Sequence, residues 1–349
     1  DNTIGIAGTH GKTTTTSMVS LCFLEANLDP SIQVGAMLKD IGGNYRVGNS
    51  DFFILEACEY VESFLKFSPQ SAIVTNIDND HLDYFKTFDN IKHAFEKYVN
   101  LLPKDGFLIT NADDPDCLDL RKHTLAQVVT FGLRNDRANF IGRNIVFDKN
   151  GFSKFDVYRN SSYFGEFKLS VPGIHNVYNA LACIAICSSY GIAKQVIKTA
   201  LLKFTGANRR FEYIGSYSNM DVYDDYAHHP SEILATAKAM KNKAYRQSWV
   251  IFQPHTYSRT KELLSDFAEA LLEFDNIIVT DIYAARENNT YGISSKDLVH
   301  KIAELGKNAL YISDFDDIAS YVKGHACPHD IILTMGAGTV WEVGKKILQ

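Results

Sequence analysis

Short apolar runs alternate along this chain with longer segments in which apolar residues recur every three to four positions. The short runs are typical of buried strands, and the 3.6-residue period is typical of helices packed on a sheet. In the first half the pattern predicts a helix opening at Lys12, helices at about 88–102, 174–190 and 193–203, and strands at 4–7, 51–56, 71–76, 107–110 and 127–131. This alternation predicts an α/β fold with a mostly parallel sheet.

Two features divide the chain. Apolar and polar residues alternate more strictly over 138–170, as in antiparallel strands, and 204–208 has the composition of a linker. After the linker the alternation restarts, with strands expected near 211–217, 220–224, 248–252, 276–280, 309–312 and 330–334, and helices near 231–244, 260–273, 294–305, 315–323 and 338–348. We therefore expect domain 1–206, with a parallel sheet and an antiparallel annex, and domain 207–349, a smaller Rossmann-like doubly wound domain.

Composition narrows the class of protein. Apolar residues make up 46% of the 349 positions, which is typical of an ordered globular chain rather than a disordered one. The formal net charge of −6 argues against a nucleic-acid binder. No apolar run reaches membrane-spanning length and no signal peptide is evident, so we expect a cytoplasmic protein without membrane contact; its oligomeric state is not set by the sequence.

The cysteine pattern fits the same compartment. None of the six cysteines forms a Cys-x-x-Cys pair, and we expect reduced, mostly buried thiols. Cys183 and Cys187 share a helix face, but two cysteines alone make a poor metal site, so core packing is the favoured interpretation.

The first strand leads into a glycine-rich loop at the start of a helix. Glycines let the backbone approach an anion, and the helix N-terminus favours negative charge, so this arrangement predicts a phosphate site. Lys12 would reach the outer phosphates and the Thr13 hydroxyl would bind Mg²⁺. The strict long motif needs glycine where Ile6 stands; the shorter Gly-x-x-Gly-Lys-Thr form is present. The predicted phosphate-binding residues are Gly8, Thr9, His10, Gly11, Lys12, Thr13 and Thr14.

Polar residues at other strand ends and helix starts are further candidates. Glu56 ends a strand and would supply an oxygen ligand for Mg²⁺, although a salt-bridged surface carboxylate is an equal alternative. His81 follows another strand and is a less usual metal ligand. His175 and Asn179 lie one turn apart, where Asn179 would match an adenine edge, or simply cap the helix.

The second domain offers three further groups of candidates. Arg210 follows the linker, where an arginine would reach phosphates, with a solvated basic pair as the alternative. The segment 224–230 places two aspartates and two histidines beside a proline, which favours a site. His255 and Arg259 follow the next strand, and Arg259 would hold a carboxylate in bidentate fashion, against ordinary loop polarity.

Taken together, these stretches resemble the Mur ligases, the ATP-dependent amide-forming enzymes of peptidoglycan precursor synthesis. The matching motifs follow in the family's order: the loop 7–16, Glu56-Ala57, Thr75-Asn76-Ile77 with Asp80-His81, His175-Asn176 with Asn179, Arg209-Arg210-Phe211-Glu212, Asp224 to Pro230, Phe252-Gln253-Pro254-His255, and Met335-Gly336-Ala337-Gly338. Within the family, the chain is most similar to the enzymes that join L-alanine to UDP-N-acetylmuramate.

The resemblance implies a set of roles. The first domain would be a P-loop ATPase, with ATP and Mg²⁺ as cofactors and with UDP-N-acetylmuramate and L-alanine as substrates. It assigns the metal to Thr13, Glu56 and His81, adenine to Asn179 with His175 and Asn176 nearby, and a phosphate contact to Arg210. It assigns the orientation of ADP or of the amine to Asp225, and places Tyr226, His228, His255 and Arg259 in the amino-acid site. Lys12, His81, Arg210 and Asp225 form the implied catalytic set.

The chain departs from the family pattern at several points. Family members often read Glu-Ala-Asp-Glu-Ser where this chain has Cys58 and Tyr60, and many carry arginine where Thr256 stands. No lysine matches the carbamylated metal ligand of some Mur ligases. The family's first, UDP-sugar-binding domain has no match, so we expect that further chain precedes Asp1 and that the fragment alone is inactive.

Two other functions compete with this one. A related ligase would add an amino acid or a recycled peptide to another acceptor, as murein-tripeptide or folylpolyglutamate-type ligases do, and an amino-acid panel separates them. A nucleotide-sensing module without catalysis would not need Glu56 and His81 beside Thr13.

Overall fold

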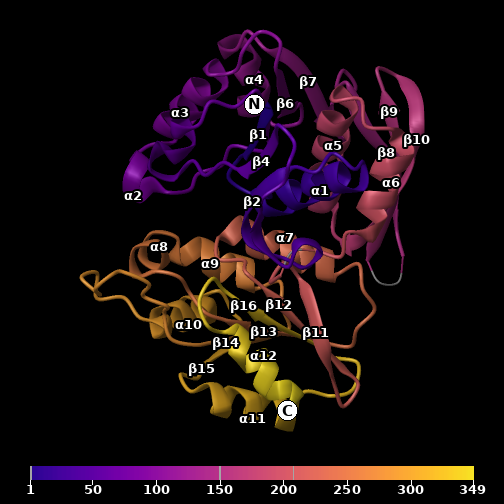
Figure 1. The fold of residues 1–349 in the computed structure, drawn as a ribbon. Coiled ribbons are helices and arrows are strands. Elements are labelled where there is room, and N and C mark those ends of the chain that lie inside the picture. Colours follow the sequence, from indigo (N-terminus) through magenta and orange to yellow (C-terminus); the bar gives the residue numbers. More distant parts are fainter. Residues whose placement is uncertain (1, 149–150, 207) are drawn as a thin grey trace. The chain divides into compact units, whose positions relative to one another are not determined.

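The computed structural model describes residues 2–148, 151–206 and 208–349. The chain divides into two compact units, Asp1–Asn208 and Arg209–Gln349, so the expected boundary after residue 206 lies two residues before this division. Each unit holds one sheet (Figure 1).

The first unit is built on a sheet with the strand order β10-β9-β8-β7-β6-β5-β1-β4-β2-β3. Neighbours from β2 to β8 pair in parallel, whereas β8–β9–β10 and the β2–β3 edge pair are antiparallel. The strands are β1 (Asn2–Ala7), β2 (Ser31–Leu38), β3 (Gly43–Arg46), β4 (Phe52–Glu56), β5 (Ser71–Val74), β6 (Phe107–Asn111), β7 (Gln127–Gly132), β8 (Phe140–Phe147), β9 (Phe152–Arg159) and β10 (Ser162–Pro172). The parallel sheet and the antiparallel annex are therefore confirmed.

Alternating side chains of the central strands supply two cores. On β5, Ile73 joins the core beneath α1, α5 and α6, while Ala72 and Val74 join the core beneath α3. The helices are α1 (Lys12–Glu25), α2 (Leu82–Phe85), α3 (Phe88–Asn100), α4 (Pro115–Asp119), α5 (Ile174–Ser189) and α6 (Lys194–Lys203), with short 3₁₀ turns η1 (Lys39–Ile41), η2 (Tyr60–Lys66) and η3 (Leu120–His123). α1 packs against both α5 and α6, so the helix that follows the glycine loop is held in the interior.

The second unit has a six-stranded sheet in the order β11-β12-β16-β13-β14-β15, parallel except for the β11–β12 hairpin. Its strands are β11 (Glu212–Tyr217), β12 (Met220–Asp225), β13 (Ser248–Phe252), β14 (Asn276–Val279), β15 (Ala309–Tyr311) and β16 (Ile331–Met335). Its helices are α7 (Pro230–Met240), α8 (Tyr257–Glu262), α9 (Leu264–Leu271), α10 (Ser295–Glu304), α11 (Phe315–His325) and α12 (Trp341–Leu348). One core lies beneath α7, α9 and α10 and the other beneath α11 and α12, so the doubly wound prediction is confirmed.

The structure differs from the predicted elements in several places, including the short helices α2 and α4, which the pattern did not predict. Strand β2 and its neighbour β3, which is the edge strand, were not predicted, because glycines at 35, 42 and 43 lower the strand propensity of residues 31–46. The single helix expected over 260–273 is two helices, because Leu263 leaves helical geometry at φ −104° and ψ 24°. The last helix begins at Trp341 rather than near residue 338.

None of the helices among the described residues is long and apolar enough to cross a membrane.

Candidate functional site

The glycine loop lies at the carboxyl end of β1, between β4 and β5. In open α/β sheets, ligands bind at the carboxyl ends of the strands, where the connections from neighbouring strands run to opposite sides of the sheet. β1 lies at such a position, between β4 and β5. Thr15 N donates to Gly11 O, which begins the hydrogen bonding of α1. The preceding N–H groups at a helix start have no partner within the helix and point along the axis, so the first turn, including Thr14, can bind an anion.

Two glycines in this loop are required by close contacts. Gly8 has φ +130°, and a Cβ there would collide with Thr75 Oγ1; Gly11 has φ +82°, and a Cβ there would lie 2.5 Å from Asn179 Oδ1. Asn76 holds the loop between them, because its Oδ1 accepts from His10 N at 2.8 Å and its Nδ2 donates to His10 O at 2.9 Å. The loop conformation is therefore fixed by residues after β5 and on α5.

Lys12 is buried at the start of α1 and makes three contacts. Its Nζ donates to Gly8 O at 2.6 Å, to Thr9 O at 3.0 Å, and to Glu59 Oε1 at 3.0 Å. Burial by itself lowers the pKa of Lys12, but the charge and hydrogen bond of Glu59 outweigh it and raise the pKa above the usual value. The lysine is thus a permanent cation folded back over its own loop.

Thr13 and Glu56 form a pair of oxygen ligands beside Lys12. The Thr13 hydroxyl donates to Glu56 Oε1 at 3.0 Å, and Gly35 N donates to Glu56 Oε2 at 2.6 Å. A Cβ at Gly35 would lie 2.7–2.9 Å from the carboxylate, so a larger residue at this position of β2 would displace the Glu56 side chain. The structure brings these two predicted metal ligands together, and a hydroxyl and a carboxylate oxygen are the donors that Mg²⁺ prefers.

His81, the third predicted metal ligand, lies beside Glu59. Its Nε2 is 3.8 Å from Glu59 Oε1 and 3.8 Å from Asp80 Oδ2, and its ring lies 4.7 Å from that of Tyr60. Glu59, 2% exposed, therefore joins His81 to Lys12, and the sequence reasoning did not nominate it. The sequence feature that could have identified Glu59 is its position three residues after Glu56.

Thr9 and His10 contact the segment after β5. Thr9 Oγ1 accepts from Asp78 N at 2.8 Å, and His10 Nε2 lies 3.1 Å from Asp78 Oδ2. These side chains fix the outer edge of the loop, and the backbone N–H groups of Thr9 and His10 donate to Asn76, so a phosphate contact by either residue stays a prediction.

The start of α5 carries the predicted adenine residues. Asn179 Nδ2 donates to Asn176 Oδ1 at 3.1 Å, and Asn176 Nδ2 donates to Pro172 O at 2.7 Å. Both amides are buried, while His175 is half-buried on the neighbouring turn. Asn179 thus lies directly against Gly11 of the phosphate loop, which joins the two predicted ATP motifs.

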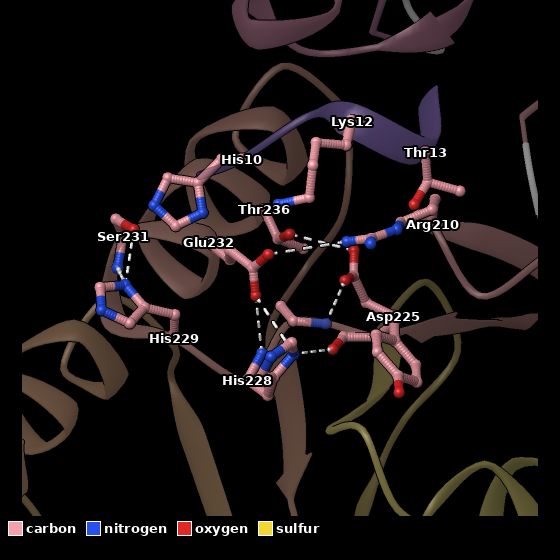
Figure 2. Close-up of polar contacts among 12 residues, drawn as sticks. His10, Lys12, Thr13, Arg210, Asp225, His228, His229, Ser231, Glu232 and Thr236 are labelled. Carbon is pink, nitrogen blue, oxygen red and sulfur yellow. Dashed lines mark hydrogen bonds and ion pairs between the residues drawn. The ribbon is translucent and has the colours of Figure 1, made fainter. Parts of the chain in front are cut away.

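In the second unit, Asp225 is buried at the end of β12. Its carboxylate accepts from Ala227 N at 2.7 Å and from Thr236 Oγ1 at 3.0 Å. Figure 2 shows Asp225 beside Thr236. Phe211 N donates to the carboxylate as well, at 3.0 Å. Burial raises the pKa of Asp225 to about 6, although the positive charge of Arg210 opposes the shift. Asp225 therefore joins β12, α7 and the start of β11.

The two neighbouring arginines differ in their surroundings. Arg209 is used within its own unit, where it contacts Asp224 Oδ2 at 2.7 Å and the carbonyl oxygens of Gly336 and Gly338 at 2.6 and 3.0 Å. Among the described residues, Arg210 has a long ion pair with Glu232, 3.7 Å, and lies over the Tyr226 ring. Of the two, Arg210 has the side chain that can turn to a ligand.

Tyr226, His228, His255 and Arg259 form one cluster in this unit. His228 Nδ1 lies 2.9 Å from Tyr226 O and its ring is 5.6 Å from His255, while Arg259 Nη1 lies 3.3 Å from His255 Nδ1. Burial, followed by the charges of His228 and Arg259, lowers the pKa of His255 to about 4. The structure thus brings all four predicted amino-acid-site residues together around a neutral imidazole.

Comparison with known families matches this arrangement. Residues 6–187 match the Mur ligase middle domain, and residues 209–338 match the Mur ligase, glutamate ligase domain. Together these matches cover most of both units. The chain belongs to the Mur ligase family.

Individual relatives narrow the comparison further. The chain is 49% identical over 346 residues to the UDP-N-acetylmuramate–L-alanine ligase of Acetivibrio thermocellus, covering 99% of this chain and 74% of that protein. The crystal structure of UDP-N-acetylmuramate–alanine ligase from Thermotoga maritima is 29% identical, with a TM-score of 0.83 over 99% of this chain and 74% of that one. A murein peptide ligase from Psychrobacter arcticus is 25% identical, with a TM-score of 0.70 over 99% of this chain and 76% of that one.

Proposed function

We propose that this protein joins L-alanine to the lactyl carboxylate of UDP-N-acetylmuramate, using ATP and releasing ADP and phosphate, in peptidoglycan precursor synthesis. The observation that carries the proposal is the arrangement of Lys12, Thr13 and Glu56 at the carboxyl ends of β1 and β4, in a chain 49% identical to a ligase of that name. The second candidate, a murein peptide ligase, is supported by the weaker structural likeness of TM-score 0.70.

The reaction needs activation because a carboxylate has no competent leaving group. The carboxylate oxygen attacks the γ-phosphorus of ATP, the bond to the β-phosphate oxygen breaks, and ADP leaves. The amine of L-alanine, having given up a proton, attacks the acyl phosphate, and inorganic phosphate departs with the bonding electron pair. The protein's contribution is positioning and charge neutralisation rather than covalent chemistry.

Magnesium fits the residues beside the loop. Thr13 Oγ1 and Glu56 Oε1 lie 3.0 Å apart and are both oxygen donors, so these two residues would hold the ion, with His81 nearer to Glu59. The ion would neutralise negative charge on the phosphates. We assign Lys12 to the same phosphates, for which it exchanges its contacts with the Gly8 and Thr9 carbonyl oxygens.

The remaining roles follow from where each side chain lies. Asn179, next to Gly11, is assigned to the adenine with Asn176 and His175, and Arg210 to the γ-phosphate. Arg259 and His228 are assigned to the alanine carboxylate, with Tyr226 and His255 shaping that site. Asp225 orients the segment 226–228 through its bond from Ala227 N and through that segment positions ADP or the amine.

The cell compartment is part of the same proposal. All six cysteines are free, and ATP is a substrate, so we place the reaction in the cytoplasm, with no nucleic acid or membrane as partner.

The test measures phosphate release by the protein as its gene encodes it. Release should require ATP, UDP-N-acetylmuramate and L-alanine together, and Lys12→Ala should abolish it, whereas Lys66→Ala, which changes an exposed lysine, should not. Phosphate release that is independent of the amino acid would overturn ligase activity. The same assay is repeated with a tripeptide or glutamate in place of alanine. If a tripeptide supports more phosphate release than alanine, the result supports the murein peptide ligase; if glutamate does, it supports a folylpolyglutamate-type ligase.

A further inference from the structure

Three cysteine sulfurs converge inside the first unit. Cys22 lies on α1, and Cys183 and Cys187 lie one turn apart on α5. Cys22 Sγ is 3.5 Å from Cys183 Sγ, Cys183 Sγ is 3.9 Å from Cys187 Sγ, and all three sulfurs lie within 4.8 Å of one another. Sequence spacing predicted the α5 pair as core packing; the fold adds a third sulfur from 161 residues away.

We propose that Cys22, Cys183 and Cys187 form a binding site for a soft, thiophilic metal ion, with Cu(I) preferred. Thiolate sulfur is the ligand that selects such ions. An ion bound at about 2.3 Å to each of three sulfurs in one plane spaces those sulfurs about 4.0 Å apart. The observed separations of 3.5 and 3.9 Å meet this spacing with shifts of about half an ångström.

The ligand set distinguishes Cu(I) from zinc. Within the described part of the chain, the group consists of three sulfurs with no histidine or carboxylate as a fourth member. Structural zinc is almost always four-coordinate, whereas a three-sulfur set suits a soft monovalent ion. All three cysteines are 0% exposed, so water is not available to complete a tetrahedron.

Packing alone is the competing explanation, since a buried cysteine behaves as a small apolar residue. It accounts for each cysteine separately, as it does for Cys117, which is equally buried but lies in the other core of the unit. It does not by itself explain why three sulfurs of this core lie within 4.8 Å of one another. Convergence is the feature that a metal site requires.

The site would join the two helices that carry the proposed ATP residues. α1 begins with Lys12 and Thr13, and α5 carries Asn179. Because the sulfurs are fully buried, the ion would enter as the unit folds or when α1 and α5 separate. A bound ion stabilises the folded state by mass action, and it touches none of the residues assigned to ATP.

The experiment refolds the whole protein without oxygen, with a phosphine reductant and one to two equivalents of Cu(I), and measures bound copper after gel filtration. We expect about one equivalent in the wild type and in Cys117→Ala, and none in Cys22→Ala or Cys187→Ala. Zinc supplied in the same way should bind at least tenfold more weakly. Copper that stays bound in Cys22→Ala, absence of binding in the wild type, or equal binding of zinc would overturn the proposal.

A second measurement uses only the wild-type protein, so its result does not depend on whether a variant folds. Copper-loaded and copper-free wild-type protein are pulsed with an alkylating agent in partial denaturant, and each cysteine is read by mass spectrometry. We expect copper to slow alkylation of Cys22, Cys183 and Cys187 by tenfold or more and to leave Cys117 unchanged. Equal protection of Cys117 would show general stabilisation and would contradict a site at the three sulfurs.

Discussion

At the residue scale, the ion pair of Lys12 and Glu59 is the most consequential contact that the sequence did not reveal. Its atoms lie 3.0 Å apart, with side-chain exposures of 13% and 3%. Removing one partner of a buried pair leaves the other charge uncompensated, so Glu59→Gln should lower the free energy of unfolding by about 3 kcal/mol. Urea unfolding measures this loss.

The matched control for that change is Glu62→Gln. Glu62 pairs with Lys97 at the same distance of 3.0 Å, but on the surface, where such a pair contributes about 1 kcal/mol or less. If the two variants lose equal stability, the burial argument for Glu59 is wrong.

A second residue-scale prediction concerns acid stability. The pKa of His255 is lowered to about 4, below its usual 6.5, by burial and then by His228 and Arg259. Below pH 6.5 His255 therefore binds a proton in the unfolded chain but not in the folded protein, and the free energy of unfolding falls as the pH drops toward 4. His255→Gln should lose less stability than the wild type between pH 7 and pH 5, as measured by urea midpoints.

The contribution of Asp225 to stability changes with pH in the opposite direction. The effect of His255 is therefore read from the difference between the variant and the wild type. Burial raises the pKa of Asp225 from 3.8 to about 6, so its contribution to stability is present below pH 4 and is lost as the pH rises through 6. This term is common to both proteins and cancels in the difference. A control, His300→Gln, changes an exposed histidine, and it should follow the wild-type pH dependence.

At the element scale, the phosphate loop depends on how closely α1 and α5 approach each other. Gly11→Ala would place a Cβ 2.5 Å from Asn179 Oδ1 at a φ of +82°, which displaces either the loop or Asn179. We expect the KM for ATP to rise by at least tenfold, as measured by phosphate release at varied ATP.

Gly42→Ala is the matched control for the loop variant. Gly42 has a φ of +65° but nothing within 4 Å of an added Cβ, so it carries the backbone strain of about 1 kcal/mol without the collision. It should leave the KM for ATP unchanged. An equal rise in both variants would mean that backbone strain, rather than contact with Asn179, disturbs ATP binding.

The same elements show what sequence reasoning reached. Local periodicity and the glycine loop predicted β1, α1 and α5, because each pattern is complete within one segment. The sequence pattern did not predict β2, whose Gly35 N donates to Glu56, because a glycine inside a strand weakens its local signal. Nor did it reveal the meeting of Cys22 with Cys183, which depends on helix packing between residues 161 positions apart.

At the scale of the whole molecule, the two units have separate interiors. Among the described residues, the first unit's cores end at Phe204 and the second unit's begin at Phe211. The residues assigned to ATP phosphates and metal lie in the first unit, except Arg210, and those assigned to alanine lie in the second. We therefore expect each unit to be stable by itself, whereas the proposed reaction needs residues of both units.

This separation predicts the behaviour of the two pieces, 1–208 and 209–349, produced separately. Each should unfold in one cooperative transition, because each retains its own sheet and its own hydrophobic cores. Piece 1–208 should bind ATP, with affinity lost in Lys12→Ala, and piece 209–349 should not. Neither should release phosphate in response to L-alanine, since Lys12 and Arg259 are then on different molecules. Circular dichroism melts, nucleotide titration and phosphate release test the three statements, and alanine-dependent release by 1–208 alone would contradict the assignment of the amino-acid site to the cluster around His255.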